Sequence, residues 1–81
     1  MASLSGTQRT TVRNAFIAVS ADYRGTATAV EWADQQMATL DAFRAGIDRS
    51  YYDFRYRPWM VANLGFTTAI RTAIDNHARG L

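Results

Sequence analysis

Half of the aromatic residues of this chain fall within one nine-residue stretch, 51–59. Five of the ten rings lie there, interleaved with two arginines. Aromatic rings are the largest apolar side chains, so this segment must either fill the interior or form a contact surface. Tyr, Trp and Arg also dominate the binding energy of protein interfaces. The segment therefore predicts an interaction surface made of Tyr51, Tyr52, Phe54, Arg55, Tyr56, Arg57 and Trp59.

The aliphatic content of the chain is low for a protein that must build its own core. Alanine occurs 14 times, whereas leucine, isoleucine and valine together occur 12 times. A chain of 81 residues buries only about 60–65% of its unfolded surface, which leaves little net stability. With no cysteine, there is no disulfide to stabilise the fold. We therefore expect a single domain, 1–81, whose burial is completed between copies in a dimer or tetramer.

The first half of the chain predicts two helices after a flexible N-terminal segment, 1–6. Ser5 or Thr7 can cap the first helix, and Gly25 can end it. Its apolar face at helical spacing consists of Val12, Phe16, Val19 and Tyr23.

The second helix begins after Thr28, which forms a capping-box pattern with Glu31, and ends near Gly46. A third helix is predicted over 58–79, because its first residue is the chain's only proline and proline is favoured in a first helical turn. The fold class is therefore all-α, with three helices in bundle-like packing.

The connection before the third helix, 48–57, fits two patterns. As a helix, it would carry Tyr52, Tyr56 and Trp59 in one stripe at i, i+4 and i+7. As a strand, it would alternate Tyr52, Phe54 and Tyr56 with charged residues, and the residue before a proline is biased towards extended conformations. We favour an extended or irregular aromatic arm, with the helix as the alternative.

All nine cationic side chains are arginine, and they are unevenly distributed. Residues 31–48 are mainly acidic, whereas 49–81 contain five arginines and two aspartates. Opposite charges on one small protein suit a homo-oligomer, in which arginines pair with Asp34 or Asp41 of a neighbouring copy. The i, i+4 spacing also predicts pairs within helices, Asp75–Arg79 and, if the connection is helical, Asp53–Arg57.

The sequence has no recognisable catalytic or metal-binding set. His77 is the only histidine, and there is no cysteine and no Gly-rich phosphate-binding loop. The carboxylates Glu31, Asp34 and Asp41 are typical of a solvated helix face. We therefore expect no enzyme activity, no cofactor and no metal, and we expect His77 to be a cation at a helix end.

The apolar segments are too short for a membrane protein. The longest run, 15–19, is far below the roughly 20 residues that span a bilayer. The N-terminus also lacks the apolar region of a signal peptide. We expect no membrane partner, no secretion by a signal peptide, and a location in the cytoplasm or in a virion.

Nucleic-acid binding is the alternative function. In the segment 49–59, arginines are interleaved with aromatic rings, a combination that contacts phosphates and stacks on unpaired bases. The net charge of only +2 and the acidic stretch 31–48 argue against it.

The function that we predict is that of a non-catalytic structural or interaction subunit. It self-associates and docks on a larger protein scaffold, for example as a capsid decoration or cement-type protein of a phage, or as another virion accessory protein. The virion context rests on small size and composition and on no residue motif. If the aromatic segment is the docking surface, replacing Trp59, or Tyr52 together with Tyr56, weakens assembly and leaves the helix content intact.

Overall fold

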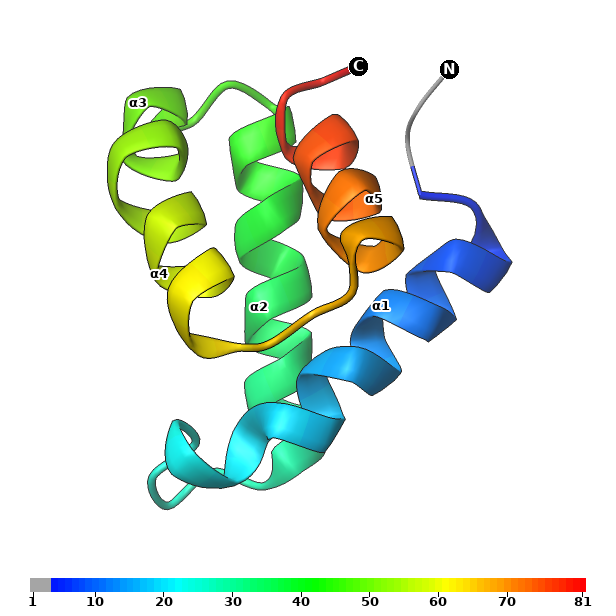
Figure 1. Cartoon of the computed structure of the whole chain (residues 1–81), viewed down its shortest axis with the longest axis vertical. Coiled ribbons are helices and arrows are strands. Elements are labelled where there is room, and N and C mark those ends of the chain that lie inside the picture. The colour runs from blue at the N-terminus through cyan, green and yellow to red at the C-terminus, as the bar shows by residue number, and fades with distance from the viewer. Residues whose placement is uncertain (1–3) are drawn as a thin grey trace.

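The computed structural model describes residues 4–81, which form four helices and, within that range, no strand (Figure 1). The elements in chain order are α1 (Gly6–Val19), a 3-10 turn η1 (Ser20–Asp22), α2 (Ala29–Arg44), α3 (Arg49–Tyr51), a π-helical segment η2 (Tyr52–Tyr56), α4 (Arg57–Asn63) and α5 (Thr68–Ala78). Because α3, η2 and α4 follow one another without a break, we call them together the 49–63 helix. The all-α fold class is confirmed.

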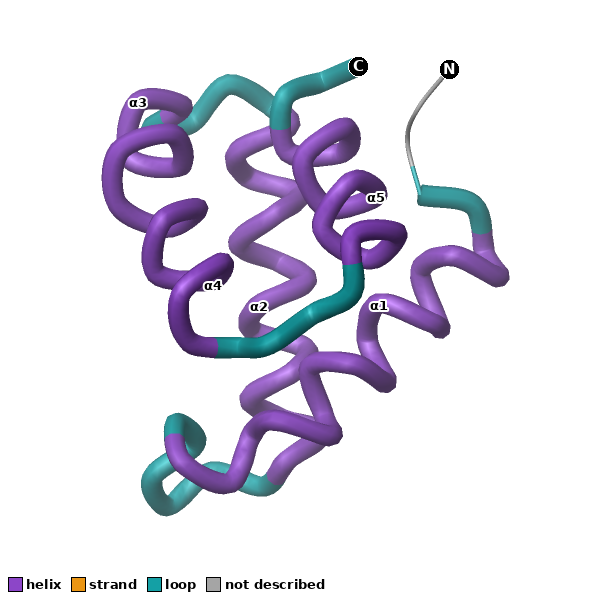
Figure 2. The backbone as a smooth tube through the Cα atoms, in the orientation of Figure 1, coloured by secondary structure: helices purple, strands orange, loops and turns teal. Residues whose placement is uncertain are grey.

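The long helix α2 lies between the other helices (Figures 1 and 2). α1 crosses it on one side, and α5 packs against both α1 and α2. The 49–63 helix runs alongside α2 and returns to α5 through a short loop across the front of the molecule (Figure 2). No helix within residues 4–81 is both long and apolar enough to cross a bilayer.

The predicted starts of the first two helices are confirmed. The Ser5 hydroxyl accepts a hydrogen bond from the Gln8 backbone N–H, and the Gln8 side chain accepts one from the Ser5 N–H. Thr28 and Glu31 form the same reciprocal pair at the start of α2. Of the N-terminal segment predicted to be flexible, residues 1–3 lie outside the described residues.

The single third helix predicted over 58–79 is wrong, because the chain turns between α4 and α5. Gly65 has φ +65°, a left-handed conformation that ends a helix and that glycine adopts without steric cost. Thr67 then caps α5 by accepting a hydrogen bond from the Ile70 N–H. Between them, Phe66 packs edge-on against Phe16 with ring centroids 5.2 Å apart. The loop therefore carries α5 back over α1.

The extended arm favoured for 48–57 is also wrong, because residues 49–57 are helical. The Arg57 N–H bonds to the Tyr52 carbonyl, five residues back, which widens this turn into a π-helix. A proline in a regular helix clashes with the carbonyl four residues earlier and lacks the N–H for that bond. The widened turn just before Pro58 allows the helix to continue through the proline.

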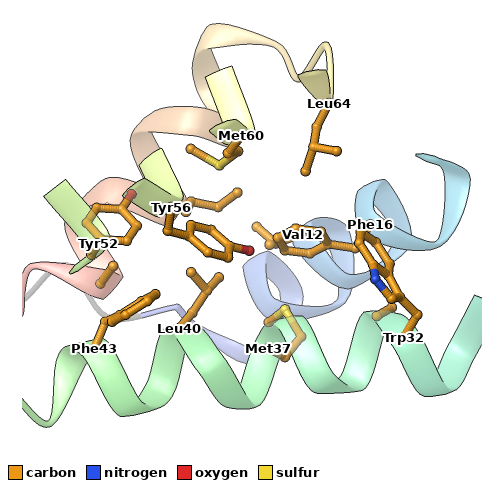
Figure 3. Close-up of a cluster of buried hydrophobic side chains, with 13 residues drawn as sticks. Val12, Phe16, Trp32, Met37, Leu40, Phe43, Tyr52, Tyr56, Met60 and Leu64 are labelled. Atoms are coloured by element: carbon orange, nitrogen blue, oxygen red, sulfur yellow. The ribbon is translucent and has the colours of Figure 1, made fainter. Parts of the chain in front are cut away.

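The core closes within a single copy of the chain. Figure 3 shows Tyr52, Tyr56 and Met60 from the 49–63 helix facing Leu40 and Phe43 of α2. The radius of gyration is 11.8 Å, against about 12 Å for a compact chain of this length. The accessible surface is 4735 Å², against about 4,900 Å² for a monomeric protein of this size. Burial between copies is therefore not needed to complete the core, and oligomerisation stays a prediction.

Candidate interaction surface

The 49–63 helix divides the seven predicted interaction residues between its two faces. Those that contact the interior are Tyr52 and Tyr56, which are buried, and Trp59, which is partly buried. Those that point to solvent are Tyr51, Phe54 and Arg55. Arg57 lies between the two faces and is partly exposed. The structure thus does not bring the seven residues together into one surface.

The inward rings fill the core between α2 and the 49–63 helix. Tyr52 and Tyr56 stack on each other with centroids 5.8 Å apart, and both contact Phe43 (Figure 3). Trp59 continues the stack by packing edge-on against Tyr56 and Tyr23. Because the Tyr52 and Tyr56 rings are buried, their replacement is expected to destabilise the fold itself. This reverses the sequence-based expectation that helix content would survive the change.

Each buried tyrosine has a polar partner for its hydroxyl. The Tyr56 hydroxyl donates to Gln36 Oε1 at 2.9 Å, and the Tyr52 hydroxyl donates to Asp75. Burial raises the pKa of both phenols, and the hydrogen bond to Asp75 raises that of Tyr52 further. Both groups therefore stay protonated and act as structural donors, without the pKa near neutrality that a general base requires.

The ion pairs join helices and do not follow the predicted i, i+4 spacing. Arg57 Nε bonds to both oxygens of Asp75 at 2.9 and 3.1 Å, and Arg79 pairs with Asp53 at 3.2 Å. The predicted pairs Asp53–Arg57 and Asp75–Arg79 are therefore wrong, because each aspartate pairs with the arginine of the other predicted pair. The four side chains fasten the 49–63 helix to α5.

The carboxylates assigned to a neighbouring copy are paired within the chain. Arg9 makes two hydrogen bonds to Asp41, at 3.1 and 2.5 Å, and Arg13 Nε lies 2.7 Å from Asp34. The hydrogen bonds from these arginines hold the pKa of each aspartate below its ordinary value. Asp34 and Asp41 were predicted to pair with arginines of a neighbouring copy. They pair instead with arginines of the same chain and join α2 to α1.

His77 is buried among three helices and is not an exposed cation at a helix end. Only 4% of the residue is exposed, and its Nε2 lies 2.7 Å from Asp41 Oδ1. Its Nδ1 accepts a hydrogen bond from the Leu4 backbone N–H at 3.3 Å. Because Nδ1 accepts this bond, Nε2 is the ring nitrogen that faces Asp41 as a donor. The ring thereby links α5 to α2 and to the segment before α1.

The outward side of the same region is apolar and exposed. Ile47 is 62% exposed, Tyr51 54% and Phe54 76%. We call these three residues, together with Asp48 and Arg55, the outer face. A few scattered apolar residues on a surface need no explanation, but large side chains gathered on one short segment indicate a contact site. Tyr51 is held in place by stacking on Phe43, with centroids 6.3 Å apart.

The turn after α2 places Ile47 on this face. The Gly46 N–H bonds to the Phe43 carbonyl and the Ile47 N–H to the Ala42 carbonyl, which is a Schellman ending. The sequence predicts this ending, in which the residue at the Ile47 position normally packs back on the helix. Here the Ile47 side chain is exposed, so it is available to a partner. Ile47 and Asp48 are the members of the outer face that sequence reasoning missed.

The described residues, 4–81, contain no pocket and no group of three or more potential metal ligands. Of the residues that the nucleic-acid alternative would use, Tyr52 and Tyr56 are buried and Arg57 is paired with Asp75. The others remain at least partly exposed: Arg49, Tyr51, Arg55 and Trp59. No protein family, curated protein or solved structure shows a significant match to this chain.

Proposed function

We propose that this protein is a non-catalytic interaction subunit that associates with a protein partner through the outer face. The observation that carries the proposal is the exposure of Phe54 and Tyr51, at 76% and 54%, on a helix whose opposite side packs on the core through Tyr52, Tyr56 and Met60. Aromatic side chains supply large contact area at a small cost in conformational entropy, and they are enriched at the centres of interfaces.

The fold supports this role because it holds the outer face rigid. The Tyr52 and Arg57 bonds to Asp75 and the Arg79–Asp53 pair fix the 49–63 helix on α5. A partner therefore meets side chains on an ordered helix, so that little ordering entropy is lost on binding. Nucleic-acid binding is less well supported, since two rings of the segment 49–59 are buried and Arg57 is paired with Asp75. This leaves Tyr51, Phe54 and Arg55, with the partly exposed Arg49, to contact bases and phosphates.

The proposal is tested by the size of the complex that contains the protein in its native cell. An epitope-tagged chain would be expressed there, and the lysate would be separated by size under mild conditions. We expect the unaltered chain to migrate as a complex, and Phe54→Ser to shift it towards the size of one chain.

The matched control is Val30→Ser, which removes another exposed apolar side chain, 45% exposed, in the first turn of α2. That turn lies at the opposite end of the molecule from α3 (Figure 1). The control should migrate like the unaltered chain. If Phe54→Ser and Val30→Ser migrate alike, the outer face is not the site of association. The wider prediction, docking on a scaffold such as a virion, is supported only if the complex is much larger than a small oligomer.

A further inference from the structure

We propose that the outer face binds a second copy of this chain in a two-fold, antiparallel arrangement, with Arg55 of each copy paired to Asp48 of the other. The inference rests on the proposed function, because it names the partner of the same face. It is carried by two exposed charges that the fold leaves unpaired, and by their positions.

Most of the charged side chains around the outer face are engaged within the molecule. Asp53 pairs with Arg79, and Arg57 pairs with Asp75. Within residues 4–81, the side chains of Asp48 and Arg55 make no ion pair and no hydrogen bond, and both are exposed. Arg49 makes no ion pair within residues 4–81 either, but it is only partly exposed and its Nε is buried. An acid and a base are thus left free on the same surface as the exposed rings.

These two charges stand on either side of the two exposed aromatic residues along the chain. Asp48 is the residue just before the 49–63 helix, and Arg55 lies within the π-helical segment of that helix, so Tyr51 and Phe54 stand between the two charges along the chain. Seven residues at the rise of an α-helix span about 10 Å, and no ion pair joins Asp48 to Arg55 within one copy. Phe54 and Tyr51 fill the space between them.

When two copies of such a face come together, the acid of one copy meets the base of the other only if the two faces run in opposite directions. A two-fold contact uses the same patch on both copies, so that residue i meets j and j meets i. With the axis near Tyr51 and Phe54, each Arg55 lies against Asp48 of the other copy, and the rings meet in the middle. A parallel arrangement would instead place like charges together.

The size of the patch sets the expected strength. Two aromatic residues and an isoleucine, each about half to three-quarters exposed, supply a few hundred Å² of apolar surface per copy. A stable interface of standard size buries about 800 Å² per partner. We therefore expect a weak dimer, with a dissociation constant in the micromolar to millimolar range.

The test is a charge exchange on the purified chain, followed by sedimentation equilibrium at protein concentrations from about 10 µM to 1 mM. Asp48→Arg alone places arginine against arginine twice, and Arg55→Asp alone places aspartate against aspartate twice. Each variant should dimerise at least about tenfold more weakly than the unaltered chain. An equimolar mixture of the two variants restores both pairs, so it should form heterodimers with an affinity within a few-fold of the original.

Two further measurements keep the result interpretable. Asp48 has φ +52°, which aspartate and asparagine tolerate better than arginine, so Asp48→Asn serves as a second variant that removes the attraction without strain. It should weaken the dimer by a smaller factor. Circular dichroism establishes that every variant is folded, and 1 M salt should reduce the difference between variants.

Several outcomes would overturn the inference: a monomer at 1 mM, a dimer indifferent to both substitutions, or a mixture that stays monomeric. If the purified chain is monomeric while the complex in the cell still depends on Phe54, only the choice of a second copy is wrong. If the complex in the cell is indifferent to Phe54, the proposed function is wrong as well.

Discussion

Asp75 of α5 binds two side chains of the 49–63 helix. It accepts hydrogen bonds from the Tyr52 hydroxyl and from Arg57, and its side chain is only 13% exposed. A carboxylate serves both partners because each oxygen can accept several hydrogen bonds and because it carries the charge that Arg57 requires. Asp75 therefore contributes two of the bonds that position the 49–63 helix, and with it the outer face.

Replacing this carboxylate tests its importance. Asp75→Asn keeps the shape but removes the charge and one acceptor, so Tyr52 or Arg57 is left without a full partner. We expect the free energy of unfolding to fall by about 1–3 kcal/mol, measured by urea denaturation followed by circular dichroism.

The control for this change is Asp22→Asn, because Asp22 is exposed and is in no ion pair among the described residues. Its effect should stay within about 0.5 kcal/mol. Equal denaturation midpoints for the two variants would show that Asp75 contributes no more than an ordinary surface aspartate.

At the scale of elements, the loop between α4 and α5 decides the topology. Gly65 has φ +65° and open space where a Cβ would lie, so any cost of alanine there comes from the backbone alone. Gly65→Ala should lower the free energy of unfolding by about 1 kcal/mol, measured from the midpoint of thermal or urea unfolding.

Gly6→Ala provides the matched comparison, since Gly6 also faces open space but does not have a positive φ. Because Gly6 is the first residue of α1, Gly6→Ala should leave the free energy of unfolding unchanged or raise it slightly. If both variants lose the same stability, the conformation of the loop is not what makes Gly65 necessary.

The same elements show how far the sequence determines the fold. Capping residues are local signals, so Ser5, Thr28 and Gly46 mark the first two helices correctly. The apolar spacing continues through the loop after α4, and only Gly65 and Thr67 mark the break. A longer helix therefore fits the same pattern, and the decision depends on how Phe66 packs against Phe16.

The candidate site was predictable in composition but not in arrangement. The aromatic stretch fits both a period of two, which the sequence favours, and a helical period, and the two place Phe54 on opposite sides of the segment. Only the packing of Tyr52 and Tyr56 on α2 selects the helical period. The ion pairs were missed for a similar reason, because Asp53 and Asp75 lie near arginines both along the chain and across to the next helix.

At the scale of the whole molecule, charges hold α1 on α2. Arg9 and Arg13 pair with Asp41 and Asp34, and His77 adds a bond to Asp41 from α5. Exposed pairs of this kind each contribute little, typically about 0–1 kcal/mol. Together with the burial of Phe16 and Val12, they fix the angle at which α1 crosses the bundle.

These pairs predict how stability depends on pH. The hydrogen bond from Arg9 lowers the pKa of Asp41 in the folded state, and a lowered pKa stabilises the fold above the ordinary value of about 4. That stabilisation is lost as the pH falls from about 4 through the lowered value. We therefore expect the midpoint temperature of thermal unfolding to decrease as the pH is lowered below 4. The decrease should be less steep in Asp41→Asn. Identical slopes for the two proteins would contradict a role for this aspartate.

The widened turn at Tyr52–Tyr56 has a consequence for helical phase. In a regular helix, each step of four residues drifts by about 40°, so Tyr52, Tyr56, Met60 and Leu64 would spiral away from one side. All four are buried, because the π-helical turn rotates less per residue and cancels part of that drift. The π-helical turn is thus equivalent to a regular turn with one extra residue, and that residue contributes no side chain to the core. A relative lacking one residue of 53–55 would place the Tyr52 and Met60 equivalents seven apart, two regular turns, and could keep the same interior while presenting a different surface outside.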